Sequence, residues 1–100
     1  MTAITALTLE NFDEYKDSMV AVFYANWCPL CLILLDELKQ LDEKCREKVK
    51  IIDFDTNSEL AKRYNITGVP TAIAFRNGKI ADVRPGFRET VQYLEMINMV

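Results

Sequence analysis

The chain alternates short apolar runs with stretches in which apolar and polar residues follow a longer period. Predominantly apolar runs cover residues 4–7, 19–25, 49–54 and 72–75, and such short runs are typical of buried strands. The run 19–25 contains no charged residue, so we predict a central strand that is covered on both faces. Asn77 and Gly78 predict a tight hairpin between 72–75 and a further strand at 79–83.

Helical spacing predicts four helices between and after these runs. We expect a helix with Thr8 as its N-cap, a long helix over residues 29–48, a short helix that ends near Tyr64, and a final helix after Phe87. The expected buried stripes are Leu9, Phe12 and Tyr15 or Lys16 in the first helix; Leu34, Leu38, Leu41 and Cys45 in the long helix; and Val91, Leu94 and Ile97 in the last.

Leu32 and Ile33 fall outside the stripe of the long helix. We expect them to be buried at the crowded start of that helix, and an exposed apolar collar beside Cys31 is the alternative. Cys45 would lie about 21 Å from Cys31 along one straight helix and could not join it. We expect Cys45 to be a small buried residue, with a regulatory thiol as the alternative.

The segment Trp27-Cys28-Pro29-Leu30-Cys31 lies where the central strand passes into the long helix. Proline is favoured at the first helical position, so Pro29 makes Cys28 the N-cap residue. The sulfur of Cys28 then faces free N–H groups and the positive end of the helix dipole, which favours a thiolate. Cys31 follows at a spacing whose side chains face one another. Such a pair can form a mixed disulfide through one thiol and resolve it through the other.

Composition limits the partners of this dithiol. Half of the 100 residues are apolar, which suits one domain over residues 1–100. The net charge is −3 and no basic run occurs, which argues against nucleic acid. No apolar stretch approaches the roughly 20 residues that cross a bilayer, and residues 1–5 lack signal-peptide features. We therefore expect a cytoplasmic monomer that does not associate with membranes.

The use of cysteine and histidine limits the chemistry. Three cysteines are too few, and odd in number, for a disulfide framework. Histidine is absent, so a zinc site within one chain would need all three cysteines and a carboxylate. We expect neither a metal nor a cofactor, and a thiolate site shared by Cys28 and Cys31 of two chains is the alternative.

The order of these elements resembles the thioredoxin family over essentially the whole chain. The resemblance rests on Trp27 before the Cys-x-x-Cys pair, the turn Gly68-Val69-Pro70-Thr71, and the Asn-Gly hairpin. It implies a three-layer α/β/α fold, in which about four helices flank a central mixed sheet of four to five strands. It also implies that Cys28 is the nucleophile, Cys31 the resolving thiol, and Pro70 a cis-proline beside them.

The resemblance further implies a protein-disulfide reductase that takes part in electron transport and cell redox homeostasis. Its substrates would be disulfide-containing proteins, and its electrons would come from a donor of the thioredoxin-reductase type. A substrate strand would lie along Gly68 and Val69, with the region of Gly86 flanking the groove. The expected substrate-binding residues are Trp27, Pro29, Leu30, Gly68, Val69, Pro70 and Gly86.

Two features depart from the family pattern. The family usually carries a buried acid and a lysine at the positions of Val22 and Ile51. Asp53 lies two residues beyond Ile51 and could serve as a base for Cys31; a solvated or capping carboxylate is the alternative. Pro29-Leu30 replaces the usual Gly-Pro, and a proline directly after the first cysteine resembles glutaredoxins. This dipeptide could make the disulfide more oxidising than usual.

The sequence is also compatible with a function of another class. The fold could serve as a scaffold without redox activity that binds a partner through apolar surface around Trp27, Leu30 and Leu32. Both cysteines are present, and a scaffold does not need them, which favours the oxidoreductase.

Overall fold

Strand β2 (Ser18–Tyr24) forms the centre of a five-stranded mixed sheet in the computed structural model, which describes residues 4–100. The strand order is β1-β3-β2-β4-β5, and the remaining strands are β1 (Thr5–Leu7), β3 (Val49–Asp53), β4 (Thr71–Arg76) and β5 (Lys79–Pro85). β3 is parallel to both β1 and β2, whereas β4 is antiparallel to both β2 and β5. These strands confirm the strand predictions. Residues 1–3 of the segment 1–5, which was judged to lack signal-peptide features, lie outside the described residues.

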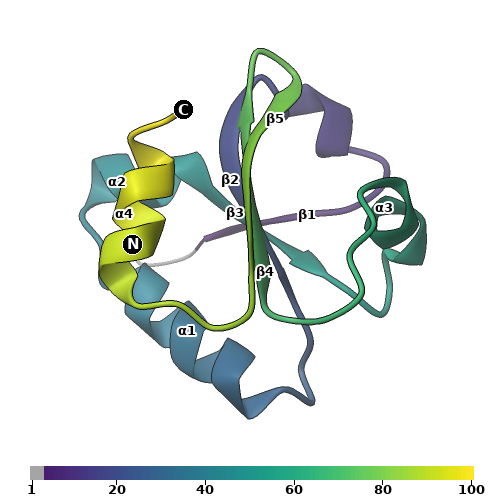
Figure 1. Cartoon of the computed structure of the whole chain (residues 1–100), viewed down its shortest axis with the longest axis horizontal. Helices are drawn as coiled ribbons and strands as arrows, with labels where there is room; N and C mark the ends of the chain where they lie inside the picture. The colour runs from purple at the N-terminus through teal and green to yellow at the C-terminus, as the bar shows by residue number, and fades with distance from the viewer. Residues whose placement is uncertain (1–3) are drawn as a thin grey trace.

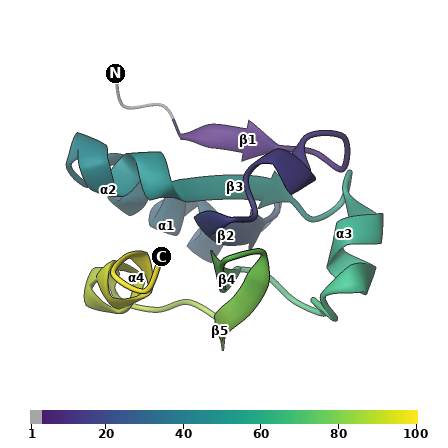
Figure 2. The same ribbon diagram turned by 90° about the horizontal axis from the view of Figure 1, so that it is seen from above.

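Helices cover both faces of the sheet, because successive strand residues point to opposite sides. On one face, Val20 and Val22 pack with residues of α1 (Pro29–Lys39) and α4 (Thr90–Ile97). On the other face, Phe23 packs with residues of α3 (Ser58–Arg63). Figures 1 and 2 show α1 and α4 on one side of the strands and α3 on the other. The three-layer α/β/α fold is confirmed.

The Asn77-Gly78 hairpin is confirmed as well. Asn77 and Gly78 have φ angles of 55° and 77°, and a tight two-residue hairpin requires positive φ at both positions. The N–H of Asn77 donates a hydrogen bond of 2.7 Å to the carbonyl of Asp17, which lies just before β2. The hairpin thereby holds β4 and β5 against the centre of the sheet.

The single helix predicted over residues 29–48 is wrong, because two helices occupy this segment. α1 ends at Lys39, and α2 (Glu43–Lys48) begins after Asp42. Asp42 has an extended backbone, and its Oδ1 accepts the N–H of Cys45 at 3.0 Å, as an N-cap does. Leu41 and Cys45 still pack against the core, so the apolar pattern continues across the break and conceals it.

The helix predicted after Thr8 is also wrong. The chain forms only a short 3-10 helix, η1 (Phe12–Glu14), and its N-cap is Asn11. The Asn11 side chain accepts the N–H of Thr8 at 2.7 Å, a local bond that competes with a regular helix. Phe12 is buried as expected, but Tyr15 is exposed, because no further helical turn carries it toward the core.

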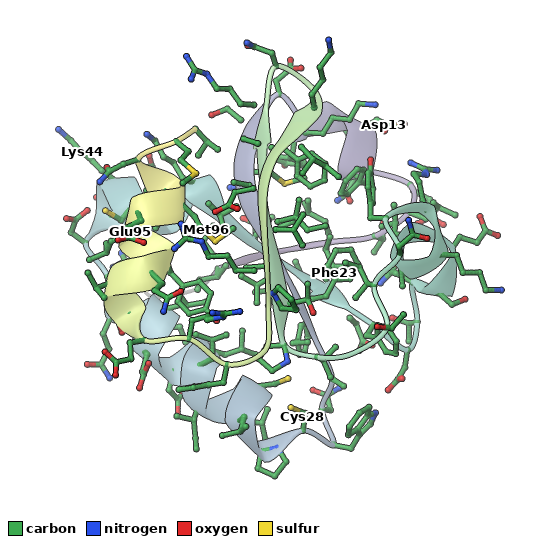
Figure 3. All side chains as sticks on the ribbon, in the orientation of Figure 1. Asp13, Phe23, Cys28, Lys44, Glu95 and Met96 are labelled. Atoms are coloured by element: carbon green, nitrogen blue, oxygen red, sulfur yellow. The ribbon has the colours of Figure 1, made fainter. Side chains whose placement is uncertain are left out.

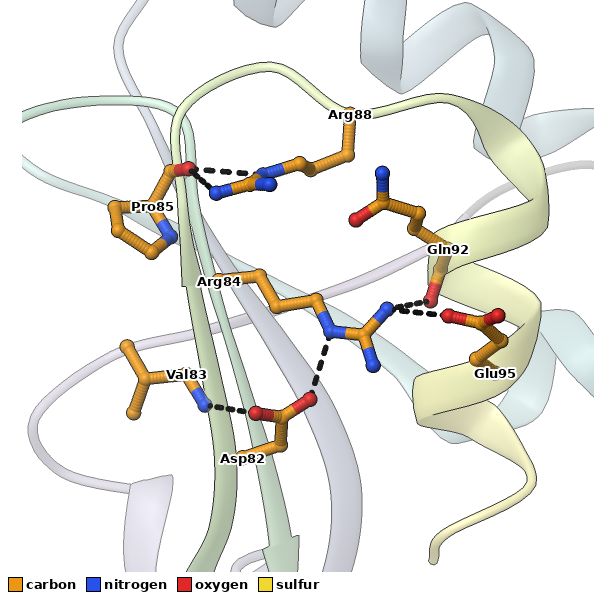
Figure 4. A network of polar contacts seen from close by, with 7 residues as sticks. All are labelled: Asp82, Val83, Arg84, Pro85, Arg88, Gln92 and Glu95. Carbon is orange, nitrogen blue, oxygen red and sulfur yellow. Dashed lines mark hydrogen bonds and ion pairs between the residues drawn. The ribbon is translucent and has the colours of Figure 1, made fainter.

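Arg84 of β5 fixes the orientation of the last helix (Figure 4). Its guanidinium binds Asp82 at 2.7 Å on its own strand, and Glu95 at 2.6 Å and the carbonyl of Gln92 at 3.2 Å on α4. α4 therefore buries Tyr93, Met96 and Ile97 and leaves Leu94 partly buried. The prediction for Val91 is wrong. Val91 is exposed, because the contacts of Arg84 with Gln92 and Glu95 set which side of α4 faces β5.

Candidate active site

Cys28 lies at the N-terminus of α1, and a three-residue loop separates it from the end of β2 (Figure 3). Its backbone is extended, its Sγ accepts the N–H of Cys31 at 3.2 Å, and Pro29 is the first helical residue. Cys28 is therefore the N-cap of α1, as predicted from Pro29. A sulfur in this place faces the free N–H groups of the first turn.

Cys31 lies one turn further along α1 and is fully buried, whereas Cys28 is 7% exposed. Burial raises the pKa of Cys31 to about 12, and the hydrogen bond and charge of Cys28 add to the increase. The two thiols are therefore unequal. Cys28 is the one that a substrate can reach, and Cys31 stays protonated behind it.

The turn before β4 lies against Cys28. The Val69–Pro70 peptide is cis, as expected from the resemblance, and the carbonyl oxygen of Val69 lies 3.9 Å from Sγ of Cys28. Thr71 Oγ1 donates a hydrogen bond of 2.7 Å to the carbonyl of Gly68 and holds this turn together. The N–H of Gly86, which has a φ of 82°, donates to the carbonyl of Pro70 at 2.8 Å.

These contacts bring four of the predicted substrate-binding residues together. Gly68, Val69, Pro70 and Gly86 line a groove of about 310 Å³ that also touches Tyr64. The groove lies beside Cys28 through Val69, and the exposed Gly68 leaves its rim open. Thr71 was missed as a supporting residue, although a hydroxyl at the end of a Gly-x-Pro turn is a usual sign of a local side-chain bond.

Trp27 directly precedes Cys28 in the sequence, and it is 65% exposed. Its indole Nε1–H donates a hydrogen bond of 2.8 Å to Oδ2 of Asp55, which follows β3. This bond fixes the ring beside the reactive loop. Sequence reasoning missed Asp55, although an acid at the carboxyl end of a neighbouring parallel strand is placed where such sites form.

Three apolar side chains stand exposed around the start of α1. Leu30, Leu32 and Ile33, which we call the apolar collar, are each about half exposed, so the expected burial of Leu32 and Ile33 is wrong. The reason is helical geometry, because the buried face of α1 is taken by Cys31, Leu34, Leu35 and Leu38. The alternative prediction, an exposed apolar collar beside Cys31, is confirmed.

Val22 and Ile51 are apolar core positions of the sheet on the side that α1 covers. Both pack in the cluster that contains Leu34 of α1. Asp53 continues the same face of β3, and its Oδ1 accepts the N–H groups of Asp55 at 2.9 Å and Thr56 at 3.2 Å. This carboxylate therefore caps the turn after β3, and its predicted role as a base stays a prediction.

Tyr24 is a partly buried neighbour of the cysteines that sequence reasoning missed. It is paired with Asp53 across β2 and β3, and it packs against the cluster of Ala25, Cys28 and Cys31. Burial raises the pKa of Tyr24, and the charge of Asp53 raises it further. The phenol therefore stays neutral beside the reactive loop.

Cys45 lies on α2 rather than at the reactive loop. It is partly buried against the core, so the expected small buried residue is only partly correct. Burial raises its pKa, and the nearby Asp42 raises it further. Within residues 4–100, no group of three possible ligands could hold a metal ion, and no helix has the length and apolar character to span a membrane.

Comparison with known proteins adds the decisive observation. The family model described as Thioredoxin matches residues 3–99. The chain belongs to the thioredoxin family. The thioredoxin of Bacillus subtilis is 32% identical over 100 aligned residues, covering 96% of each protein. The thioredoxin of Mycoplasmoides gallisepticum is 44% identical over 82 residues, covering 79% of this chain and 80% of that protein.

A solved structure agrees with these relatives. A mutant thioredoxin from Halobacterium salinarum superposes with a TM-score of 0.86 and 27% identity, over 98% of this chain and 90% of the other. As a member of the thioredoxin family, this chain is a thiol-disulfide oxidoreductase. A scaffold without redox activity is not favoured.

Proposed function

We propose that this thioredoxin-family oxidoreductase reduces protein disulfides through Cys28 and Cys31. The observation that carries the proposal is the asymmetry of the pair: Cys28 keeps a small exposed fraction and its Sγ accepts the N–H of Cys31, whereas Cys31 is fully buried. The thiolate of Cys28 attacks one sulfur of a substrate disulfide. A mixed disulfide forms, and the other substrate sulfur leaves as a thiolate that takes a proton from solvent.

Cys31 completes the turnover. Its sulfur attacks Sγ of Cys28, so that the Cys28–Cys31 disulfide forms and the second substrate sulfur departs. That sulfur takes up the equivalent of the proton that Cys31 loses. A donor of the thioredoxin-reductase type then returns two electrons and two protons, as expected from the resemblance, and restores both thiols.

The groove beside Cys28 would hold an extended segment of the substrate. Gly68 and Val69 offer backbone groups along the groove, and Pro70 and Gly86 line it beside them. Trp27, Pro29 and Leu30 would contact the substrate on the helix side, where all three are exposed. We therefore propose these seven residues as the substrate-binding set for disulfide-containing proteins.

Mutation of each cysteine tests this assignment. Insulin reduction is expected to vanish in Cys28→Ser. Cys31→Ser is expected to trap a mixed disulfide with the substrate, which non-reducing electrophoresis would detect. Cys45→Ser is the matched control and should keep full activity. Equal insulin reduction by Cys28→Ser and the wild type would overturn the assignment.

Asp53 is proposed as the base for Cys31. Its place on the same face of β3 as Ile51 and its pairing with Tyr24 support this role, whereas its Oδ1 already caps a turn. Asp53→Asn should shift the pH dependence of disulfide reduction. An unchanged pH profile would leave Asp53 as a capping carboxylate only.

Pro29 and Leu30 are proposed to make the disulfide more oxidising than that of an ordinary thioredoxin, since residues between the cysteines alter how the helix start stabilises a thiolate. Equilibration with glutathione would measure the potential, and a value at or below that of an ordinary thioredoxin would contradict this.

We further propose that residues 1–100 form one domain that acts as a cytoplasmic monomer. The length and the apolar half of the chain support one domain, and the small, odd number of cysteines supports a reducing compartment.

A further inference from the structure

The first two turns of α1 expose an apolar surface that goes beyond the proposed substrate-binding set. Leu32 is 46% exposed and Ile33 is 50% exposed, and of the apolar collar only Leu30 belongs to that set. The segment 18–35 contains no Asp, Glu, Lys or Arg. The exposed positions further along α1 are the charged residues Asp36 and Lys39. The apolar part of the exposed face is thus confined to the end of the helix that holds Cys28.

The apolar collar is continuous with the reactive cysteine. Leu32 follows Cys28 by four residues, and its N–H donates a hydrogen bond of 3.2 Å to the Cys28 carbonyl. Ile33 follows Leu30 by three residues, and residues three or four apart on a helix are neighbours on its surface. The collar therefore begins at the residue that must meet a substrate sulfur and extends one turn outward along α1.

The groove beside Cys28 and the apolar collar are built from different elements. The groove is lined by residues 64–71, 83, 85 and 86, and no residue of α1 lines it. An extended segment that fills the groove need not cover Leu32 or Ile33. A folded protein is larger than such a segment, and because Cys28 is only 7% exposed, the surface around its disulfide must come close to the start of α1. A folded protein can therefore cover the collar.

The chemistry and the size of the collar also favour a folded protein that is held only briefly. The collar carries no charge to pair with an acidic or basic partner, and an exposed apolar patch is typical of a contact between proteins. Three half-exposed aliphatic side chains fall well short of the roughly 800 Å² per partner that a stable complex buries. The collar thus suits a partner that leaves after each turnover rather than a lasting dimer of this chain.

We propose that Leu32 and Ile33 are specificity-determining residues that bind the apolar surface beside the disulfide of a folded protein and favour such substrates over small disulfides. The inference rests on the proposed reduction of protein disulfides and adds a class of substrate to it. The two side chains take no part in the exchange of sulfur atoms. They stabilise the complex in which Cys28 attacks, because the contact removes apolar surface from water.

Replacement of both side chains by glutamine removes the apolar surface and keeps a good helix former at each position. The double variant Leu32→Gln/Ile33→Gln should reduce insulin with a kcat/KM about tenfold lower than that of the wild type. Its rate with dithionitrobenzoate, a small disulfide, should not change; all proteins in that assay carry Cys45→Ser, so that the third thiol does not contribute. Ile80→Gln is the matched control and should keep both rates, because Ile80 is 46% exposed beside the β4–β5 hairpin, at the end of the sheet opposite to Cys28 (Figure 3).

Hydroxyl-radical footprinting tests the contact itself. In the mixed disulfide of Cys31→Ser with insulin, Leu32 and Ile33 should oxidise several-fold more slowly than in the free variant, whereas Ile80 should oxidise equally in both. Equal oxidation of Leu32 and Ile33 in both, or an unchanged kcat/KM for insulin in the double variant, would overturn the proposal. Protection in the free protein that grows with its concentration would overturn it in favour of a second copy of the chain. A wild type that does not reduce insulin at all would instead overturn the proposed function.

Discussion

The thiol of Cys31 is kept neutral mainly by burial, and this couples the ionisation of one residue to the stability of the fold. In the folded reduced protein its pKa is raised from 9.0 to about 12. Between these pH values the unfolded chain has released a proton that the folded chain still binds. The free energy of unfolding therefore falls as the pH rises through this range, and the stabilisation is fully present below pH 9.

Denaturant titration of the reduced protein and of Cys31→Ser tests this coupling. The reduced wild type should lose more stability than Cys31→Ser between pH 9 and pH 12. The oxidised protein has no Cys31 thiol and should follow the variant. Identical slopes for all three forms would mean that Cys31 titrates near its ordinary value.

The bond from Trp27 to Asp55 makes a prediction for substrate binding. Asp55→Ala removes the acceptor of the indole N–H, so the ring should become mobile at the side of the reactive loop. We expect KM for insulin to rise a few-fold, while the reaction rate with a small disulfide stays the same. The indole N–H of the single tryptophan should exchange faster with solvent in proton NMR.

Asp36→Ala serves as the control for this prediction, since Asp36 is an exposed acid on α1. A rise in KM of the same size in both variants would point to lost negative charge rather than to the lost bond. A rise in neither would show that a fixed indole is not needed for binding.

Residues with local signals were predictable at the site, and residues that act across the fold were not. Cys28 was identified as the N-cap because Pro29 and the cysteine spacing are contained in five residues. Asp55 reaches the site from the end of β3, through a contact with Trp27 that no local pattern encodes. Leu32 and Ile33 were misjudged because the angular position of α1 on the sheet decides which apolar residues are covered.

At the scale of the elements, α1 has one apolar face in the core and another in solvent. Leu34 is 1% exposed, so Leu34→Ala should lower the free energy of unfolding by about 2–5 kcal/mol. Leu32→Ala, the matched change on the exposed face, should alter it by less than about 0.5 kcal/mol. Urea denaturation measures both, and comparable losses would contradict the assignment of the two faces.

The cap of α2 makes a second prediction at this scale. Asp42→Ala removes the acceptor for the N–H of Cys45, so the midpoint of thermal unfolding should fall. That hydrogen bond also lowers the pKa of the Asp42 carboxyl in the folded state. Its stabilisation is present above the unfolded pKa and is lost as the pH falls through the lowered one.

The difference in unfolding temperature between wild type and Asp42→Ala should therefore vanish in acid. Asp36→Ala, which removes an exposed acid of α1, is the control for the loss of one negative charge. A constant gap at every pH would mean that Asp42 stabilises α2 by something other than its charge.

Strands were easier to predict than helix boundaries. Four apolar runs correspond to strands, because each run is about as long as a strand and is bounded by polar turns. The break at Asp42 was missed because α1 and α2 pack on the same face, so that one apolar period runs through both. The regular helix expected after Thr8 does not form. The side chain of Asn11 accepts the N–H of Thr8, and this local hydrogen bond competes with a regular helix.

At the scale of the whole molecule, Arg84 joins the sheet to α4 through Asp82 and Glu95. Arg84→Met should loosen α4, so that its amides exchange hydrogen faster while those of α3 remain as they are. Arg76→Met, at an exposed arginine of β4, is the control. Mass spectrometry of hydrogen exchange measures the effect, and equal protection of α4 in both variants would contradict it.

The layers of the molecule could be predicted, but the rotation of α4 within its layer could not. The order of strands and helices resembles that of thioredoxins, which implies the three layers. Val91, Leu94 and Ile97 have the correct period, yet the polar contacts of Arg84 turn the helix so that Tyr93 and Met96 face the core. A pattern of apolar residues gives the period of a helix but not which neighbour fixes its angle.

The two outer strands of the sheet also bear on how copies of the protein behave at high concentration. β1 has only 3 residues, and β5 ends in a proline and carries charged side chains. Short, charged or proline-bearing edges offer a second chain few backbone groups to pair with. The protein can thus keep a reactive thiol beside an apolar collar without inviting strand-to-strand aggregation.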